Sequence, residues 1–120
     1  MHKLFVEFIG TMFLAFVVFA SGNYMAIGLA LAIAAFLGGP ISGGAYNPAI
    51  AIAMFSAGKL ANADLVPYII AEIGGGLLGA YLSQMLLWYK RVIETCDINM
   101  WYKHVIDTIY YLAKYIVYGR

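Results

Sequence analysis

The chain has 120 residues, of which 64% are hydrophobic and 11% are charged. A typical soluble domain is about 45–50% apolar and about 25% charged, so a soluble fold of this composition would expose too much apolar surface. The net charge of +1 provides no basic patch for nucleic acid, and the single cysteine excludes an intrachain disulfide or a cysteine-based metal site. The composition therefore predicts an integral, multi-pass membrane protein whose surroundings are the lipid bilayer.

Charges divide the sequence into two parts. Of the 13 charged residues, five lie before residue 90 and eight lie in residues 90–120. We therefore expect a membrane domain over residues 1–89, followed over residues 90–120 by a polar loop and an amphipathic tail.

Three apolar stretches approach or reach the ~20 residues that a transmembrane helix needs. They cover residues 4–20, 24–39 and 66–89. Pro67 is tolerated in the first turn of the third stretch, and Asp64 is a suitable N-cap before it. The first stretch also resembles a cleavable signal peptide, although Glu7 inside the apolar run argues against that alternative.

A shorter apolar segment, residues 47–55, lies between the second and third stretches. As a helix it would measure about 13 Å, or about half of a ~30 Å hydrocarbon core. The preceding residues 38–48 are rich in Gly and Pro, and irregular backbone at membrane depth must be buried in protein or line a watery cavity. The predicted fold is an all-α membrane protein with three transmembrane helices and one re-entrant half-helix.

Small residues recur at every fourth position on three of these segments, which places them on one face of each helix. The three rows are Ala26, Ala30, Ala34 and Gly38; Ala49, Ala53 and Ala57; and Ala71, Gly75, Gly79 and Ser83. They predict surfaces for close helix packing.

The half-helix opens with Asn47, Pro48 and Ala49. Pro48 suits a first helical position, and Asn47 suits the N-cap, where its side-chain oxygen accepts a backbone N–H. Its NH₂ group stays free to donate, beside the positive end of the helix dipole. This combination suits uncharged hydrogen-bonding solutes and disfavours cations and protons. The alternative is that Asn-Pro only starts an ordinary helix.

Residues 3–89 resemble the N-terminal half of the aquaporin and aquaglyceroporin family, the major intrinsic proteins. The motifs that carry the resemblance are Lys3-Leu-Phe-Val-Glu-Phe-Ile-Gly-Thr11, Ile27-Gly-Leu-Ala30, Ser42-Gly-Gly-Ala-Tyr-Asn-Pro-Ala49 and Val66-Pro-Tyr-Ile-Ile-Ala-Glu72. The resemblance implies a membrane channel for passive transport of water or small neutral solutes such as glycerol.

The resemblance also implies roles for pore residues. Asn47, Pro48 and Ala49 would contact the solute, and Ile27 would narrow the pore at the family's aromatic/arginine constriction. Water-selective members commonly have Phe at that point and glycerol-passing members often have Trp, so Ile27 indicates an atypical constriction. Ala45 stands where the family usually has a histidine, which removes one polar contact of the loop.

Two acidic residues are implied to brace the loop. Glu7 would accept backbone N–H groups, as the matching acid of the family's first helix does. Glu72 stands where the family usually has glutamine on its third helix. Burial of a lone carboxyl there would favour its neutral form.

A family pore combines two inverted halves that each supply one half-helix, and this sequence holds one Asn-Pro-Ala box. The predicted channel therefore acts through self-association of half-pores in a homo-oligomer, or with a full-length aquaporin-like partner. In a topology like that of the family, Lys3 and Lys59 lie on one side of the membrane and Lys90 and Arg91 on the other, so the basic residues do not fix an orientation. Two interpretations are open: the chain inserts in both orientations, or it is a truncated descendant whose topology signals have decayed. The alternative function is a non-conducting, truncated aquaporin-like membrane interaction protein.

The tail is expected to hold an interfacial amphipathic helix. Val105, Ile109, Leu112 and Ile116 fall on one helical face. Asp107 and Lys114 interrupt a spanning run, although a fourth span remains an alternative because Lys114 could snorkel. Residues 94–99 are expected to form a polar loop.

Nothing in the sequence indicates an enzyme. There is no nucleophile–base pair, metal-ligand cluster or phosphate-binding loop. We therefore expect neither catalytic residues nor a cofactor.

Overall fold

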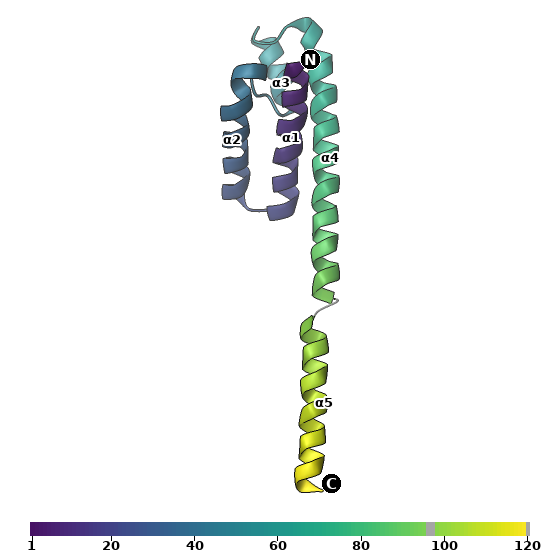
Figure 1. Ribbon diagram of the computed structural model, residues 1–120. Coiled ribbons are helices and arrows are strands. Elements are labelled where there is room, and N and C mark those ends of the chain that lie inside the picture. The colour runs from purple at the N-terminus through teal and green to yellow at the C-terminus, as the bar shows by residue number, and fades with distance from the viewer. Residues whose placement is uncertain (96–97, 120) are drawn as a thin grey trace. The chain divides into compact units, whose positions relative to one another are not determined.

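The computed structural model describes residues 1–95 and 98–119. These residues form five helices and no strand (Figure 1). The helices are α1 (His2–Ser21), α2 (Tyr24–Ser42), α3 (Pro48–Ser56), α4 (Asn62–Thr95) and α5 (Ile98–Tyr118). The predicted all-α class is confirmed. The chain separates into two compact units, Met1–Leu87 and Trp88–Arg120.

Three stretches are long and apolar enough to cross a membrane: α1, α2, and one within the stretch Asn62–Val117. They correspond to the three predicted spans. α2 continues past residue 39 to Ser42, with Pro40 inside its last turn.

Two expectations about α4 and its flanks were wrong. α4 begins at Asn62, so Asp64 lies in the first helical turn and is not the N-cap. There the Asp64 carboxylate pairs with the Lys3 ammonium at 3.8 Å. The polar loop expected over residues 94–99 is also shorter, because α4 continues to Thr95 and α5 begins at Ile98. The rest of that predicted loop, residues 96 and 97, lies outside the described residues.

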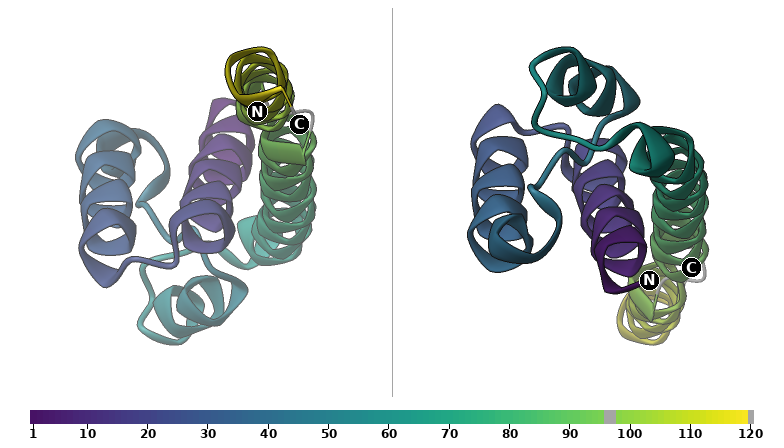
Figure 2. Two further views of the ribbon diagram at one scale, coloured as in Figure 1. Left: turned by 90° about the horizontal axis from the view of Figure 1, so that it is seen from below. Right: turned by 90° about the horizontal axis from the view of Figure 1, so that it is seen from above.

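In the first unit, α1 lies between α2 and the first part of α4 (Figure 2). Gly75 and Gly79 bring α4 close to the backbone of α1, because a Cβ at these positions would overlap the carbonyl oxygens of Phe8 and Met12, respectively. Ser83 continues the same face and is fully buried. The predicted small-residue row on α4 is a packing surface, as close approach of helix backbones requires.

The small-residue rows predicted on α2 and α3 differ in their burial. On α2, Ala30, Ala34 and Gly38 are buried, in agreement with the prediction. On α3, Ala49 and Ala53 are exposed, as is Ala57 at its C-cap, and Ala51 is the buried residue. The predicted α3 row is therefore wrong as a packing surface within the chain. The short helix packs its opposite side against a small core formed by Ala45, Ala51, Leu60 and Tyr68.

Candidate functional site

The five residues between α2 and α3 form a loop with unusual backbone conformations. Gly43 and Gly44 have φ angles of 92° and 69°, and Tyr46 has a φ of 48°. Glycine adopts this left-handed region without strain, whereas a residue with a Cβ pays about 1–2 kcal/mol. Tyr46 therefore needs strong contacts to hold its conformation.

Glu7 of α1 supplies the first of these contacts. Its carboxylate is completely buried and accepts hydrogen bonds from the backbone N–H groups of Ala45 at 3.1 Å and Tyr46 at 2.6 Å. Loop N–H groups have no partner in a helix or sheet, so a buried charged acceptor stabilises them strongly. The structure thus places Glu7 directly against the loop.

Two tyrosines that sequence reasoning missed also hold the loop. The Tyr46 hydroxyl donates to the carbonyl oxygen of Ala34 at 2.7 Å, and the Tyr68 hydroxyl donates to that of Ser42 at 2.7 Å. The Tyr46 ring occupies the space left by Gly10 on α1 and Gly38 on α2, where a Cβ would overlap it. Glycines on neighbouring helices are the sequence signal that could have pointed to a large side chain between them.

Asn47 is the N-cap of α3, as predicted. Its side-chain oxygen accepts the Ala49 N–H at 2.9 Å, and Pro48 occupies the first helical position. This bond leaves the side-chain NH₂ of Asn47 as a donor. Asn47 and Ala49 are exposed and Pro48 is half-buried. The box is therefore held in place by its neighbours while its polar group stays accessible.

An open hollow of about 510 Å³ borders the box between α1 and α4. Its lining includes Thr11, Tyr46, Asn47, Pro48, Glu72 and Gly76. Glu72 is 1% exposed, and neither of its carboxyl oxygens has a hydrogen-bond partner among the described residues. Glu72 borders the same hollow as Asn47, and its role in bracing the loop stays a prediction. An unsatisfied buried polar group costs about 1–3 kcal/mol.

Ile27 lies apart from the box. It is half-buried in the first turn of α2 and is not among the residues that line the hollow. Tyr46 is anchored to Ala34, seven residues further along α2, which corresponds to about 10 Å along the helix axis. The structure thus brings together Glu7 and the Asn47 loop, and puts Ile27 at a different level. Within residues 1–95 and 98–119, no group of three or more His, Cys, Asp or Glu residues could hold a metal ion.

The chain is similar to several channel proteins. It is 42% identical over 89 residues to the "Glycerol uptake facilitator protein-like 6" of Lactiplantibacillus plantarum, a match that covers 67% of this chain and 41% of that protein. It is 35% identical over 95 residues to "Aquaporin Z" of Photorhabdus laumondii, covering 67% and 41%. It is 34% identical over 101 residues to "Aquaporin Z" of Brucella melitensis, covering 72% and 44%. The chain spans less than half the length of these curated relatives, and no solved structure matches it.

The family model described as "Major intrinsic protein" matches residues 22–113. This match is well over half of the chain and includes Ile27, the Asn47 box and Glu72, whereas Glu7 precedes it. With three stretches able to cross a bilayer, the protein is an integral membrane protein. On this evidence the chain belongs to the major intrinsic protein family, which includes the aquaporins.

Proposed function

We propose that this protein is a membrane channel for passive transport of water or small neutral solutes such as glycerol. Membership of the family supports such a channel at the family level. The observation that carries the proposal for this chain is the Asn47 cap, which opens a nine-residue helix and borders an open hollow. A fixed donor beside accessible space is what passage of a hydrogen-bonding solute requires.

We further propose that α3 is a re-entrant half-helix. Its nine residues would extend about 13 Å, too short to cross the bilayer. The loop before it is tied by Tyr46 to Ala34, which lies near the middle of the 19-residue α2. This tie supports a position for Asn47 near the centre of the membrane, with the positive end of the α3 dipole beside it.

The pore would be completed by a second copy of the chain in the opposite orientation. The hollow between α1 and α4 is open next to Asn47, and apolar side chains of both helices, such as Leu14 and Leu77, line it. A second half-helix placed in this hollow would cover these side chains. In a two-fold pair, each copy would fill the hollow of the other in the same way. The self-complementary arrangement would supply the two inverted halves that the family pore uses.

The proposed roles follow from these positions. Asn47, with Pro48 and Ala49, contacts the solute, and Glu7 braces the loop that presents them. Ile27 narrows the pathway at a separate level, about 10 Å from the Ala34 anchor along α2.

Osmotic shrinkage of proteoliposomes, followed by stopped-flow light scattering with water and glycerol, tests this function. The Asn47→Leu variant removes both the donor and the cap of α3. Asn23→Leu is the matched control, because Asn23 caps α2 through its side-chain oxygen, which accepts N–H groups of Met25 and Ala26. We expect fast shrinkage in the wild type and in Asn23→Leu, and loss of it in Asn47→Leu. Wild-type rates equal to those of empty liposomes, from folded protein, would refute the channel.

The alternative is a non-conducting membrane interaction protein. The exposed row of Ala49 and Ala53 on α3 and Ala57 at its C-cap favours it, because small residues on an open helix face suit contact with another helix. Co-purification with a full-length aquaporin-like protein, together with an absence of flux from this chain alone, would support this function over conduction.

A further inference from the structure

The residues of α5 separate into an apolar row and a charged row. Val105, Ile109, Leu112 and Ile116 follow one side of the helix at helical spacing. Lys103, Asp107 and Lys114 have the spacing of the opposite side. From Met100 to Val117 every side chain is exposed apart from Val105, which is half-buried. This apolar row therefore needs a covering that the described residues do not supply.

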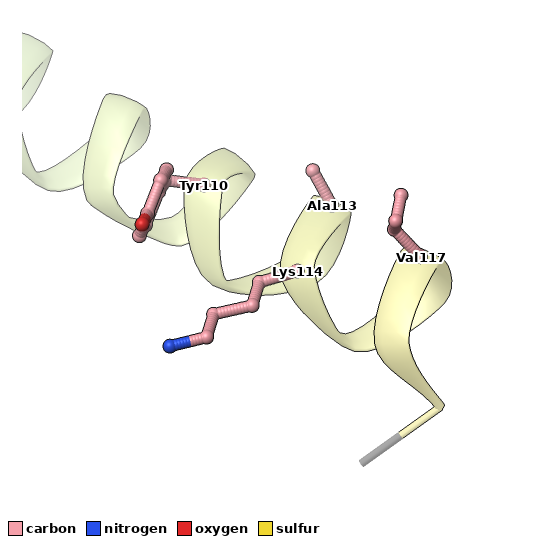
Figure 3. A pocket seen from close by; sticks show the side chains of 4 residues that line it. All are labelled: Tyr110, Ala113, Lys114 and Val117. Atoms are coloured by element: carbon pink, nitrogen blue, oxygen red, sulfur yellow. The ribbon is translucent and has the colours of Figure 1, made fainter.

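Aromatic residues lie between the two rows. At about 100° per residue, Trp101, Tyr111 and Tyr115 follow one edge of the apolar face, and Tyr102 and Tyr110 follow the other. Figure 3 shows part of the second edge, where Tyr110, Ala113, Lys114 and Val117 line one shallow hollow of α5. Rings that carry a polar group are enriched where hydrocarbon meets water.

We infer that α5 lies flat in the headgroup region of the lipid bilayer, with its apolar row towards the acyl chains. This surface anchoring is separate from the proposed pore. α5 itself carries Lys103 and Lys114 against Asp107, a small excess of cations that suits a membrane with anionic headgroups. The stems of Lys103 and Lys114 can lie along the helix while their ammonium groups reach the headgroups.

Two other coverings fit the residues less well. As a fourth span, α5 would place Asp107, the tenth of its 21 residues, at the bilayer centre, where an acidic residue costs about 2.5–3.5 kcal/mol. As one helix of a coiled-coil pair, α5 would be expected to have charged residues on both sides of a narrow apolar row. Here the flanking residues are tyrosines and Trp101.

The length of chain before α5 keeps it within reach of the lipid surface. The apolar part of α4 ends at Trp88 and Tyr89, and Lys90 and Arg91 follow directly. Aromatic and basic residues in this order mark a membrane–water interface. Residues 90–95 add about 9 Å of helix, and only two residues separate α4 from α5.

Depth-dependent quenching of Trp101 fluorescence tests the inference. The chain has two tryptophans, so the Trp88→Phe variant leaves Trp101 as the reporter, and the reciprocal Trp101→Phe variant gives the signal to subtract if the first folds poorly. The full chain is reconstituted in phosphatidylcholine with 20% phosphatidylglycerol and with lipids brominated at three depths. We expect the shallowest bromines to quench most. Strongest quenching by the deepest bromines would indicate a fourth span, and no quenching would indicate water or a protein covering; either result would overturn the inference.

A matched pair of variants tests which face is buried. Ile109→Lys places a cation in the apolar row, and Asp107→Lys places the same side chain in the charged row. We expect quenching to fall by about half or more in the first and to be kept in the second. Equal losses in both variants would overturn the proposed orientation. The readout does not depend on flux, so a non-conducting protein could still confirm the anchoring.

Discussion

The carboxylate of Glu7 accepts the backbone N–H of Tyr46 at 2.6 Å, although the two residues are 39 positions apart. Tyr46 has a left-handed backbone conformation and directly precedes Asn47, so this hydrogen bond orients the start of the Asn-Pro-Ala box. The orientation of a polar group beside the open hollow is thus set by a side chain of the first helix.

Replacing this carboxylate by an amide should destabilise the fold. In Glu7→Gln, one loop N–H would face an NH₂ group in place of an oxygen, and we expect the free energy of unfolding to fall by about 1–3 kcal/mol. Unfolding in detergent, followed by near-UV circular dichroism, measures the change. The control is Glu94→Gln, since Glu94 makes an exposed i,i+4 pair with Lys90 that should contribute little. Equal shifts in both variants would contradict the assigned contact.

The second buried acid should behave differently. Glu72 has no hydrogen-bond partner among the described residues, so Glu72→Gln removes no bond within the chain. We expect this variant to keep its expression level, its fold and its elution as an oligomer in size-exclusion chromatography. Loss of the folded oligomer would show that the charge of Glu72 is required.

Adjacent glycines of α4 offer a matched test of the packing against α1. A Cβ at Gly75 would overlap the Phe8 carbonyl oxygen, whereas at Gly76 the nearest atom would be Thr11 Cγ2 at 3.8 Å, an ordinary contact. We expect Gly75→Ala to lower the unfolding temperature, because overpacking costs about 1–3 kcal/mol. Gly76→Ala should leave it unchanged or raise it slightly, since alanine is the better helix former. The same loss at both positions would argue against the close approach.

A double-mutant cycle tests the packing of Tyr46. A Cβ at Gly38 would overlap both the Tyr46 hydroxyl and Val6 Cγ1, so Gly38→Ala should destabilise the protein, and less so when Tyr46→Phe has already removed the first of these overlaps. We expect a coupling free energy of about 0.5–3 kcal/mol. The control pairs Gly39→Ala with Tyr46→Phe, because a Cβ at Gly39 would meet no atom within 4 Å. Additive effects in both cycles would be inconsistent with the structure.

Enlarging Ile27 should change permeation without changing the fold. If Ile27 narrows the pathway, Ile27→Trp should change the permeation rates of water and glycerol, because it changes the width of the constriction. Solute uptake into proteoliposomes measures both rates. Leu29→Trp serves as the control, since Leu29 is 62% exposed on the same helix. Unchanged rates in Ile27→Trp would remove this residue from the proposed pathway.

The spans and the cap of α3 could be predicted because they depend on local properties. Apolar length predicts α1 and α2 to within a few residues, and Asn followed by Pro predicts the start of α3. Helix ends were less predictable, as Asp64 and Pro40 show, because both residues are tolerated inside a first or last turn as well as at its boundary. Burial of Ala51 in place of Ala49 and Ala53 depends on which side of a short helix meets Leu60 and Tyr68.

The contacts of the loop were only partly predictable. The structure shows that Glu7 accepts two N–H groups of the loop, and its bracing role in a pore stays a prediction. Tyr46 and Tyr68 were not predicted, because their partners are backbone carbonyl groups that carry no residue identity. The lack of a partner for Glu72 also depends on tertiary contacts. The division of the chain at residues 89 and 90 into two domains stays a prediction.

The anchoring of Tyr46 has a consequence for biosynthesis. Glu7, Ala34 and Tyr46 all lie within the first 46 residues, so the contacts that orient the box become possible before α4 has been made. Because translation adds about 5–20 residues per second, an interval of a second or more would pass before Tyr68 could reach Ser42. The loop can therefore take its shape in a nascent chain, and the third long helix would then close over it.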